Sequence, residues 1–366
     1  MKKVGILTYH FALNYGAILQ CYALKKALSE IGLESSVINF ISEKQEMNNS
    51  LFNKRQGLKN VAMQIALFPF KKDRIAKSEK FDLFSNNYLN CTERCKDESE
   101  LKKIIKDEKY DYIVCGSDQV WNPYIEDFTK MFFLPFKTKI KKIGYAVSIG
   151  KCKHQELSFY GKYIEDFSCI GVREASAKSV LNKFTSKELI EVVDPTMLLN
   201  INEWNEMANK SDININEPYM ICYFLKKETF SKEYELAQKL AKEKNLKLYY
   251  INQRFTKRSF YKNTICDAGP EDFVKLIKNA EFVCTDSFHG TIFSIMFRKD
   301  FYSLVDTENT NDQRRQNILE KLGLMDRCIY LDNIEFNNSN IDYENVQKEI
   351  EILRNNSKNF LINSLN

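Results

Sequence analysis

The chain has 366 residues, which is enough for two domains that each bury a hydrophobic core of their own. An apolar share of 44% and an aromatic share of 13% are typical of a folded globular protein and exclude a disordered one. No stretch approaches the roughly 20 apolar residues of a membrane-spanning helix. The first residues resemble a signal peptide only briefly, because Asn14 and an amphipathic helix follow, and we therefore expect a cytoplasmic protein.

The net charge of +5 arises in residues 51–80, where eight Lys and Arg outweigh two acidic residues. The same segment contains LKNVAMQIALFPF, an apolar stretch with helical spacing. It is either an ordinary solvated helix flanked by lysines or a patch that rests on an anionic membrane surface. In the second case the protein is peripheral at the inner face of the membrane. We expect no nucleic-acid partner.

Ten cysteines are scattered through the sequence, most of them inside apolar strand or helix patterns. No C-x-x-C pair occurs, and Cys91 and Cys95 have neither a second pair nor a nearby histidine to complete a zinc site. We therefore expect buried free thiols and no metal site.

The amino-terminal half alternates between apolar runs and helical patterns. A strand over 4–10, a helix over 17–32 that Gly32 closes and a strand over 35–41 form a βαβ unit. Further apolar runs follow at 111–115, 143–147, 169–172 and 191–199. Because helical patterns separate most of these strands, we expect parallel pairing in an α/β sheet.

Residues 200–217 are polar and lack strong periodicity, which indicates a linker, and a second α/β run follows. A long amphipathic pattern over 342–366 ends the chain. We therefore predict an α/β protein with two doubly wound Rossmann-like domains facing across a cleft, where ligands bind beyond the carboxyl ends of the strands. The expected division is an amino-terminal domain over 1–205, a carboxy-terminal domain over 206–335 and a terminal helix over 336–366.

Polar residues follow several of the predicted strands. Asn14, Tyr15 and Gly16 follow the first strand, and the helix start there either serves the turn or binds an anion through its N–H groups. Ser117 and Asp118 follow a later strand and either cap a helix or face a ligand.

Two large side chains near these corners also suggest ligand contacts. Trp121 is unusual in a bare turn and fits an aromatic wall for a sugar ring. Arg173 directly follows an apolar strand, where an unpaired charge is costly to bury. It either faces the cleft or pairs with Glu174.

One of the three histidines, His289, lies between an apolar run that predicts a buried strand and another that predicts a helix. The N–H groups of His289, Gly290 and Thr291 would form the first turn of that helix, which favours a phosphate. The hydroxyls of Thr285 and Ser287 lie beside this turn. The alternative is a histidine that only caps the helix.

Together these motifs resemble the polysaccharide pyruvyl transferase family over roughly residues 1–330. The matching segments are GILTYHFALNYGAILQCYAL, VCGSDQVWN, SIG, GVREASAKSVL, VVDPTMLL, EDFVKLIKNAEFVCTDSFHGTIFSIMF and RRQNILEKLGL. The resemblance implies a fold similar to the two-domain glycosyltransferase B fold. It also implies an enzyme that moves pyruvate from phosphoenolpyruvate onto two sugar hydroxyls as a cyclic ketal, in capsules, exopolysaccharides and cell-wall polymers.

This chemistry needs a cationic cradle for two anionic groups, an acid and a base, but neither a metal nor a cofactor beyond phosphoenolpyruvate as co-substrate. We expect His289 to hold the phosphate and donate the proton, and Asp118 to act as base from the opposite domain. Arg173 would hold the carboxylate or phosphate. Residues 206–335 would then bind phosphoenolpyruvate, and residues 1–205 a saccharide acceptor, free or lipid-linked.

One position departs from the family pattern. Several relatives carry an arginine where this chain has Ser287. If that arginine holds the donor, its charge must come here from Arg173, Arg314 or Arg315.

Two other interpretations use the same cleft. A nucleotide-sugar glycosyltransferase would also place a histidine at a helix start, against a nucleotide phosphate. A noncatalytic saccharide-binding protein would hold the sugar between Trp121 and Tyr15 without making a bond.

Overall fold

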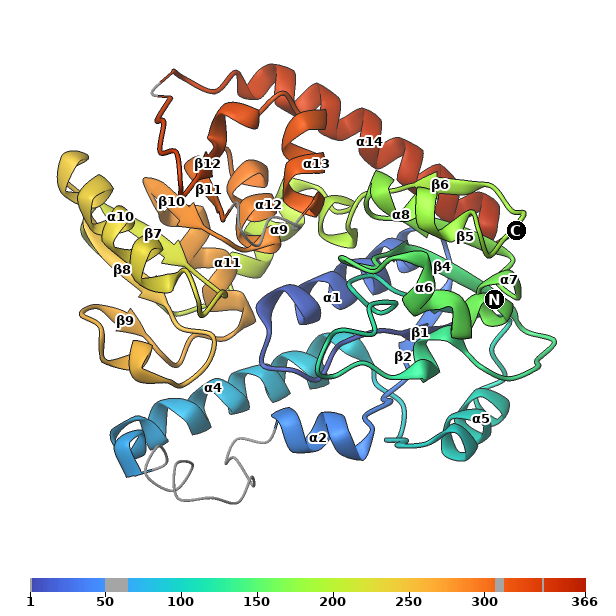
Figure 1. Ribbon diagram of the computed structural model, residues 1–366. Coiled ribbons are helices and arrows are strands. Elements are labelled where there is room, and N and C mark those ends of the chain that lie inside the picture. Colours follow the sequence, from blue (N-terminus) through green and yellow to red (C-terminus); the bar gives the residue numbers. More distant parts are fainter. Residues whose placement is uncertain (1, 50–64, 307–312, 338) are drawn as a thin grey trace.

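The computed structural model describes residues 2–49, 65–306, 313–337 and 339–366. It contains two six-stranded parallel sheets with helices packed around them (Figure 1). The predicted α/β class with two doubly wound sheets is therefore confirmed.

The first sheet is built from the amino-terminal half of the chain. Its strands are β1 (Lys3–Leu7), β2 (Glu34–Val37), β3 (Tyr112–Cys115), β4 (Lys141–Val147), β5 (Cys169–Val172) and β6 (Leu189–Glu191). They pair in parallel in the order β2-β1-β3-β4-β5-β6. β1 and β3 are apolar runs buried along nearly their whole length, as in sheets covered on both faces. The strand order reverses between β1 and β3, which is where such sheets bind ligands.

The helices of this half have mixed lengths. They are α1 (Tyr15–Glu30), α2 (Glu43–Asn49), α4 (Lys71–Phe84), α5 (Glu98–Asp107), α6 (His154–Leu157), α7 (Gly161–Glu165) and α8 (Ala175–Leu181). α1 begins where Asn14 accepts hydrogen bonds from the N–H groups of Gly16 and Ala17 through its side chain. The predicted first helix is confirmed, with its start two residues earlier.

The second sheet follows in the carboxy-terminal half. Its strands are β7 (Tyr219–Tyr223), β8 (Lys247–Ile251), β9 (Thr264–Ile265), β10 (Phe282–Thr285), β11 (Asp300–Val305) and β12 (Cys328–Tyr330). They pair in parallel in the order β12-β11-β10-β7-β8-β9. The helices of this half are α10 (Phe230–Glu243), α11 (Pro270–Asn279), α12 (Phe288–Met296) and α13 (Gln313–Lys321).

The stretch between the sheets differs from the prediction. The expected strand over 191–199 ends at Glu191, because Asp194 accepts a hydrogen bond from the Thr196 N–H and starts the 3-10 turn η5 (Pro195–Met197). The expected linker over 200–217 contains α9 (Ile201–Ala208). This polar segment forms a short helix because Asn200 caps its start and because burial of Trp204 stabilises it.

The last helix, α14 (Tyr343–Ser364), returns to the first sheet (Figure 1). Ser357 Oγ accepts a hydrogen bond from the Val193 N–H at 2.9 Å, and Arg354 Nε donates to the Met197 carbonyl at 2.7 Å. Phe360 packs so closely on β5 that a Cβ added at Gly171 would lie 2.9 Å from its ring. The chain that leaves the second sheet is thereby fastened to the first.

A continuous apolar core joins the two sheets. Tyr15 of α1 stacks on Phe273 of α11 with ring centroids 4.6 Å apart, and Trp204 of α9 meets Phe293 of α12 edge-on at 4.8 Å. Burial of this much aromatic surface holds the domains together in this arrangement.

The basic segment over 51–80 lies partly outside the described residues, since 50–64 are not among them. Within α4 the charges divide between two faces. Lys71 and Lys72 are exposed, whereas Lys77 is buried and donates to the Asn252 carbonyl at 2.6 Å. Burial lowers the pKa of Lys77 to about 7. The inner face of this helix therefore bridges the two domains.

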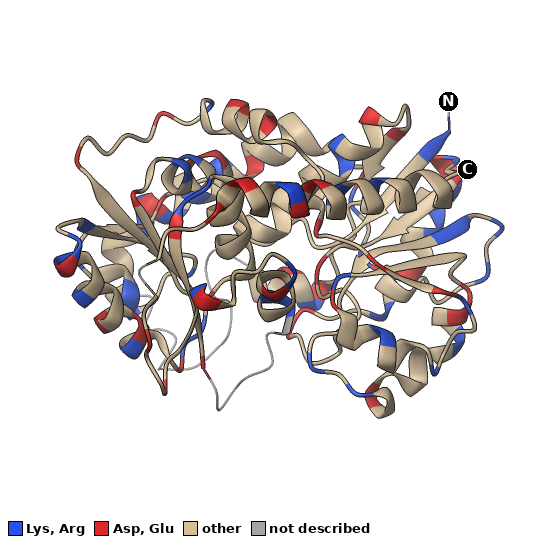
Figure 2. Cartoon of the chain, turned by 90° about the horizontal axis from the view of Figure 1, so that it is seen from above, with Lys and Arg blue, Asp and Glu red and all other residues tan. Residues whose placement is uncertain are grey.

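Basic and acidic residues are intermixed over both halves of the molecule in the view of Figure 2. All ten cysteines are free thiols, two of them half-buried and the others buried, as expected. None of the helices in the described part of the chain is both long and apolar enough to cross a membrane.

Candidate active site

The starts of two helices meet where the domains face each other. α1 begins after β1, and α12 begins at its cap Ser287 after β10. His289 lies in the first turn of α12, and a Cβ added at Gly16 would lie 2.0 Å from its Nδ1. The imidazole therefore packs directly on the backbone of Gly16, which explains why this position is a glycine.

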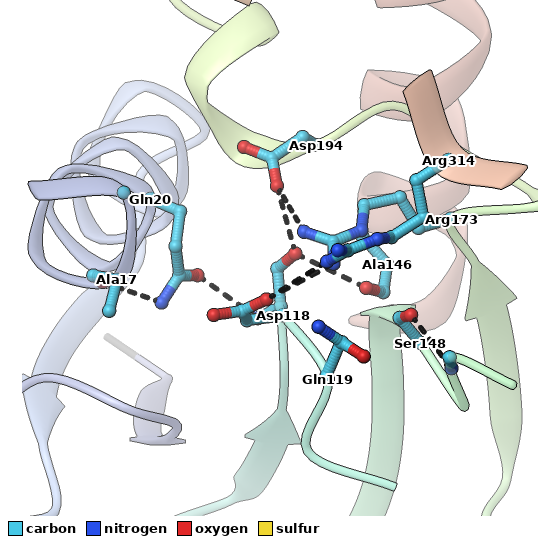
Figure 3. A network of polar contacts seen from close by, with 12 residues as sticks. Ala17, Gln20, Asp118, Gln119, Ala146, Ser148, Arg173, Asp194 and Arg314 are labelled. Carbon is cyan, nitrogen blue, oxygen red and sulfur yellow. Dashed lines mark hydrogen bonds and ion pairs between the residues drawn. The ribbon is translucent and has the colours of Figure 1, made fainter. Parts of the chain in front are cut away.

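A buried carboxylate faces the other ring nitrogen. Asp194 Oδ2 lies 3.5 Å from His289 Nε2. It also accepts hydrogen bonds from Ser117 Oγ at 3.2 Å and from Arg173 Nη1 at 2.9 Å, and Figure 3 shows the side chains of Asp194 and Arg173 facing each other. Its Oδ1 accepts from the N–H and the hydroxyl of Thr196. Burial alone would raise the pKa of Asp194, but the charges of His289 and Arg173 outweigh it and lower the pKa. Asp194 is therefore an ionised group held in one orientation.

Arg173 is the buried cation of this cluster. It follows β5 and donates through Nη1 to Asp194 and through Nη2 to Asp118 Oδ1 at 3.1 Å. Its guanidinium lies over the ring of Phe288 at 4.8 Å. Glu174 turns elsewhere and accepts a hydrogen bond from Ser148 Oγ at 2.8 Å. Arg173 thus faces the site and pairs with two aspartates instead of with Glu174.

Asp118 connects this cluster to the open cleft. Its Oδ1 contacts Arg173 and lies 3.7 Å from Arg314 Nη1. Burial would raise the pKa of Asp118, but Arg173, His289 and Arg314 lower it overall. A carboxylate that is stabilised in this way is ionised, and its predicted role as general base stays a prediction.

A cleft of about 440 Å³ adjoins the cluster and is lined from both domains. The first domain contributes Asn14, Asp118, Gln119 and Asp127, among others, and the second contributes the segment 253–256. Amides, carboxylates and the ring of Phe255 line its wall, which is the chemistry that recognises hydroxyl-rich ligands.

Two predicted aromatic ligands lie elsewhere. Trp121 is completely buried, donates from Nε1 to the Phe132 carbonyl at 3.1 Å and stacks on Phe133. Tyr15 is also buried, and its hydroxyl donates to the Ala268 carbonyl at 3.0 Å. Both rings are part of the core, so the prediction that they contact a sugar is wrong.

The hydroxyl groups near His289 stabilise the turn between β10 and α12 through hydrogen bonds within the protein. Thr285 Oγ1 donates to the Tyr223 carbonyl at 2.6 Å, and Ser287 Oγ accepts from the Gly290 N–H at 3.3 Å. Thr291 Oγ1 donates to the Ser287 carbonyl at 3.0 Å. These contacts show Ser287 as the helix cap and the neighbouring hydroxyls as its supports, whereas the sequence predicted phosphate contacts for them.

The arginines proposed to replace the family arginine differ in exposure. Arg315 is fully buried and donates from Nη1 to the Leu304 carbonyl at 2.7 Å. Arg314 is partly exposed and lies over the Phe288 ring at 5.7 Å, beside Arg173. Once the amide of Gln119 is oriented to suit its neighbours, its oxygen accepts from both Nη atoms of Arg314 at 3.1 and 3.2 Å. Arg314 is therefore the guanidinium positioned to reach a ligand.

Asp194 is the site residue that the sequence analysis did not identify. The apolar run over 191–199 predicts a strand there, although an Asp-Pro pair after an apolar run is a recognisable turn signal. Across the described ranges, no three or more His, Cys, Asp or Glu side chains gather closely enough to hold a metal ion.

Comparison with solved structures defines the class of fold. UDP-GlcNAc 2-epimerase from Methanocaldococcus jannaschii has a TM-score of 0.53 at 15% identity, with 97% of this chain and 93% of that chain covered. The Neisseria meningitidis UDP-GlcNAc 2-epimerase bound to UDP-GlcNAc has a TM-score of 0.51 at 13% identity, with coverages of 100% and 99%. The structure of S. aureus MnaA with UDP has a TM-score of 0.52 at 13% identity, with 98% of this chain and 91% of that chain covered. The fold is the glycosyltransferase B fold of such sugar enzymes.

The sequence identifies the family within this class. The polysaccharide pyruvyl transferase family matches residues 14–307, which is most of the chain. The chain therefore belongs to the polysaccharide pyruvyl transferase family, as its motifs predicted. No curated protein matches the sequence.

The contact between Gly16 and His289 gives a direct test of the site. We expect Gly16→Ala to lower the melting temperature, because the new methyl group overlaps the imidazole. Removing the ring should relieve this overlap, so Gly16→Ala/His289→Ala should melt above the Gly16→Ala protein. Gly144→Ala is the control, since its added Cβ would make contacts of 3.4 Å or longer. A double variant that melts lower than both single variants would contradict the contact.

Proposed function

We propose that the protein transfers pyruvate from phosphoenolpyruvate onto two hydroxyls of a sugar in a polysaccharide or its lipid-linked precursor, forming a cyclic ketal. Membership of the pyruvyl transferase family supports the class of reaction. The observation that carries the assignment of the site is the position of His289, which lies at a helix start between Gly16 and the ionised Asp194.

The reaction sets definite chemical requirements. Carbon 3 of phosphoenolpyruvate gains a proton, which leaves oxocarbenium character at carbon 2. One sugar hydroxyl adds to carbon 2 and loses its proton to a base. Phosphate leaves with the electrons of its C–O bond and takes the proton of the second hydroxyl, which closes the ring. A proton donor, a base and cationic groups around the phosphate and carboxylate are therefore needed.

The residues of the cluster fit these requirements, with one revision in the residue that binds the donor. His289 is the proposed proton donor, because it lies at a helix start with Nε2 3.5 Å from the ionised carboxylate of Asp194. Arg314 is the proposed ligand of the donor's phosphate or carboxylate, since Arg173 already pairs with two aspartates. Asp118 is proposed to accept a hydrogen bond from an acceptor hydroxyl and to be the base that takes its proton.

The acceptor is proposed to lie in the 440 Å³ cleft that Asp118 lines. Asp127 in its wall is itself held by Asn48 Nδ2 at 2.8 Å and Asn49 Nδ2 at 3.0 Å. Fixed carboxylates and amides of this kind suit the hydroxyls of a saccharide. Residues from both domains line the cleft, so donor and acceptor are proposed to meet at the domain interface.

The first experiment tests the donor. We expect phosphoenolpyruvate to raise the melting temperature and inorganic phosphate to be released from it only when a suitable saccharide is present, with no loss of rate in EDTA. Stabilisation by UDP- or CMP-sugars instead would favour a nucleotide-sugar glycosyltransferase. Stabilisation by glycans alone would favour a noncatalytic saccharide-binding protein. Loss of activity in EDTA that a divalent ion restores would contradict the metal-free reaction.

A second experiment separates proton donation from helix capping. His289→Gln retains hydrogen-bonding groups but has no proton to donate, so we expect turnover to fall by roughly 10² to 10⁴ while the melting temperature changes little. Ser287→Ala removes the cap and is the matched control, with a loss of about 1 kcal/mol in stability and near-normal turnover per folded molecule. A destabilised but active His289→Gln protein would refute the catalytic assignment.

A third experiment tests Asp194 as a positioning residue. Asp194→Asn removes the negative charge 3.5 Å from Nε2 and keeps a side chain of the same shape. We therefore expect turnover per folded molecule to fall, because the imidazole loses the carboxylate that positions it, while KM for phosphoenolpyruvate changes little. A role in folding alone predicts a lower melting temperature with normal turnover per folded molecule.

A further inference from the structure

Exposed apolar side chains gather at one edge of the molecule, where α4 meets the second domain. Ile65 and Phe68 lie before α4, and Phe68 is 69% exposed. Phe260, which is 58% exposed, and Tyr261 lie at the end of the 3-10 turn η6 (Lys257–Phe260). The rings of Phe70 and Phe260 meet edge-on with centroids 4.8 Å apart, which joins the two groups into one edge.

Exposed cations surround these apolar side chains. Lys71 and Lys72 directly follow Phe70, and Lys257 and Lys262 flank the rings of Phe260 and Tyr261. All four of these lysines are exposed. Residues 65–72 and 254–262 contain only basic and neutral side chains, and Asp73 is the next residue along α4. An edge of protruding rings and lysines, without carboxylates, complements an anionic bilayer surface.

This edge adjoins the opening of the cleft. Arg74, one helical turn after Lys71, lines the cleft and lies over the Phe255 ring at 5.6 Å. Arg254 and Thr256, just before η6, also line the cleft. In Figure 1 the start of α4 lies at the lower left, near the part of the second domain that carries β9, the strand that follows η6.

We propose that this edge, formed by residues 65–72 and 257–262, docks the protein on an anionic phospholipid bilayer. The inference rests on the proposed function in one respect, because a lipid-linked saccharide would then enter the cleft directly from the membrane. The phenylalanine rings enter the headgroup region, and the lysines pair with lipid phosphates. The edge draws on both domains, so it is complete only in the arrangement that also forms the site.

Vesicle co-sedimentation tests the proposal without any acceptor or turnover. The full chain should sediment with vesicles of equal parts phosphatidylglycerol and phosphatidylcholine, but weakly with phosphatidylcholine alone, and salt should release it. Lys71→Gln/Lys72→Gln should weaken binding by about fivefold for each charge removed. Lys102→Gln/Lys103→Gln, on exposed positions of α5, is the matched control and should bind normally.

The apolar contribution needs its own pair of variants. Phe68→Ser and Phe260→Ser should each weaken vesicle binding, whereas Phe159→Ser, at a position 82% exposed elsewhere, should not. Melting temperatures confirm that the variants are folded. No sedimentation of the parent protein, or equal binding of edge and control variants, would overturn the proposal, as would a dimer in light scattering that only the edge variants lose.

Activity on a soluble saccharide separates this proposal from the proposed function. The edge variants should retain the parent rate of phosphate release from phosphoenolpyruvate with a soluble acceptor. If the protein binds vesicles but does not consume phosphoenolpyruvate, the proposed reaction is refuted and the proposed membrane docking is still supported.

Discussion

Arg173 carries a full positive charge into a site where almost no solvent reaches it, and the groups around the site are arranged to compensate that charge. Asp118 and Asp194 each accept one of its hydrogen bonds. Removing one partner of such a network leaves an uncompensated buried charge, which is among the most costly changes in a folded protein. The loops after β3, β5 and β6 are therefore held in fixed positions, and the site is preorganised before a ligand arrives.

The same network extends across the domain interface to His289. The imidazole lies between the backbone of Gly16 and the carboxylate of Asp194, and both belong to the first domain. Separation of the domains would remove both contacts together. Chemistry that depends on His289 is thus linked to the relative position of the domains, a common way for two-domain enzymes to complete a site.

Charge compensation also defines what the site offers to an anionic donor. Two aspartates already satisfy Arg173, so a phosphate or carboxylate gains little from it without displacing one of them. Arg314 lies at the edge of the network, partly exposed, and shares Asp118 at the longer distance of 3.7 Å. A ligand at this edge would compete with this longer contact and with the neutral amide of Gln119, instead of with two carboxylates that accept hydrogen bonds from Arg173.

The α/β class, most of the strands, the first helix, the corner at His289 and the family were all predictable from the sequence. Each depends on a local pattern, such as a run of apolar residues or a short motif. Such patterns can be recognised in the sequence without knowledge of the fold. The domain boundaries and the roles of the site residues stay predictions.

Only the tertiary structure decided which way particular side chains point. Trp121 and Tyr15 looked like ligand contacts but are core residues, and Lys77 looked like part of a basic surface but bridges the domains. Asp194 looked like part of a strand but holds the centre of the site. These outcomes depend on partners far away in the chain, and burial of a side chain is decided by the surface that packs against it.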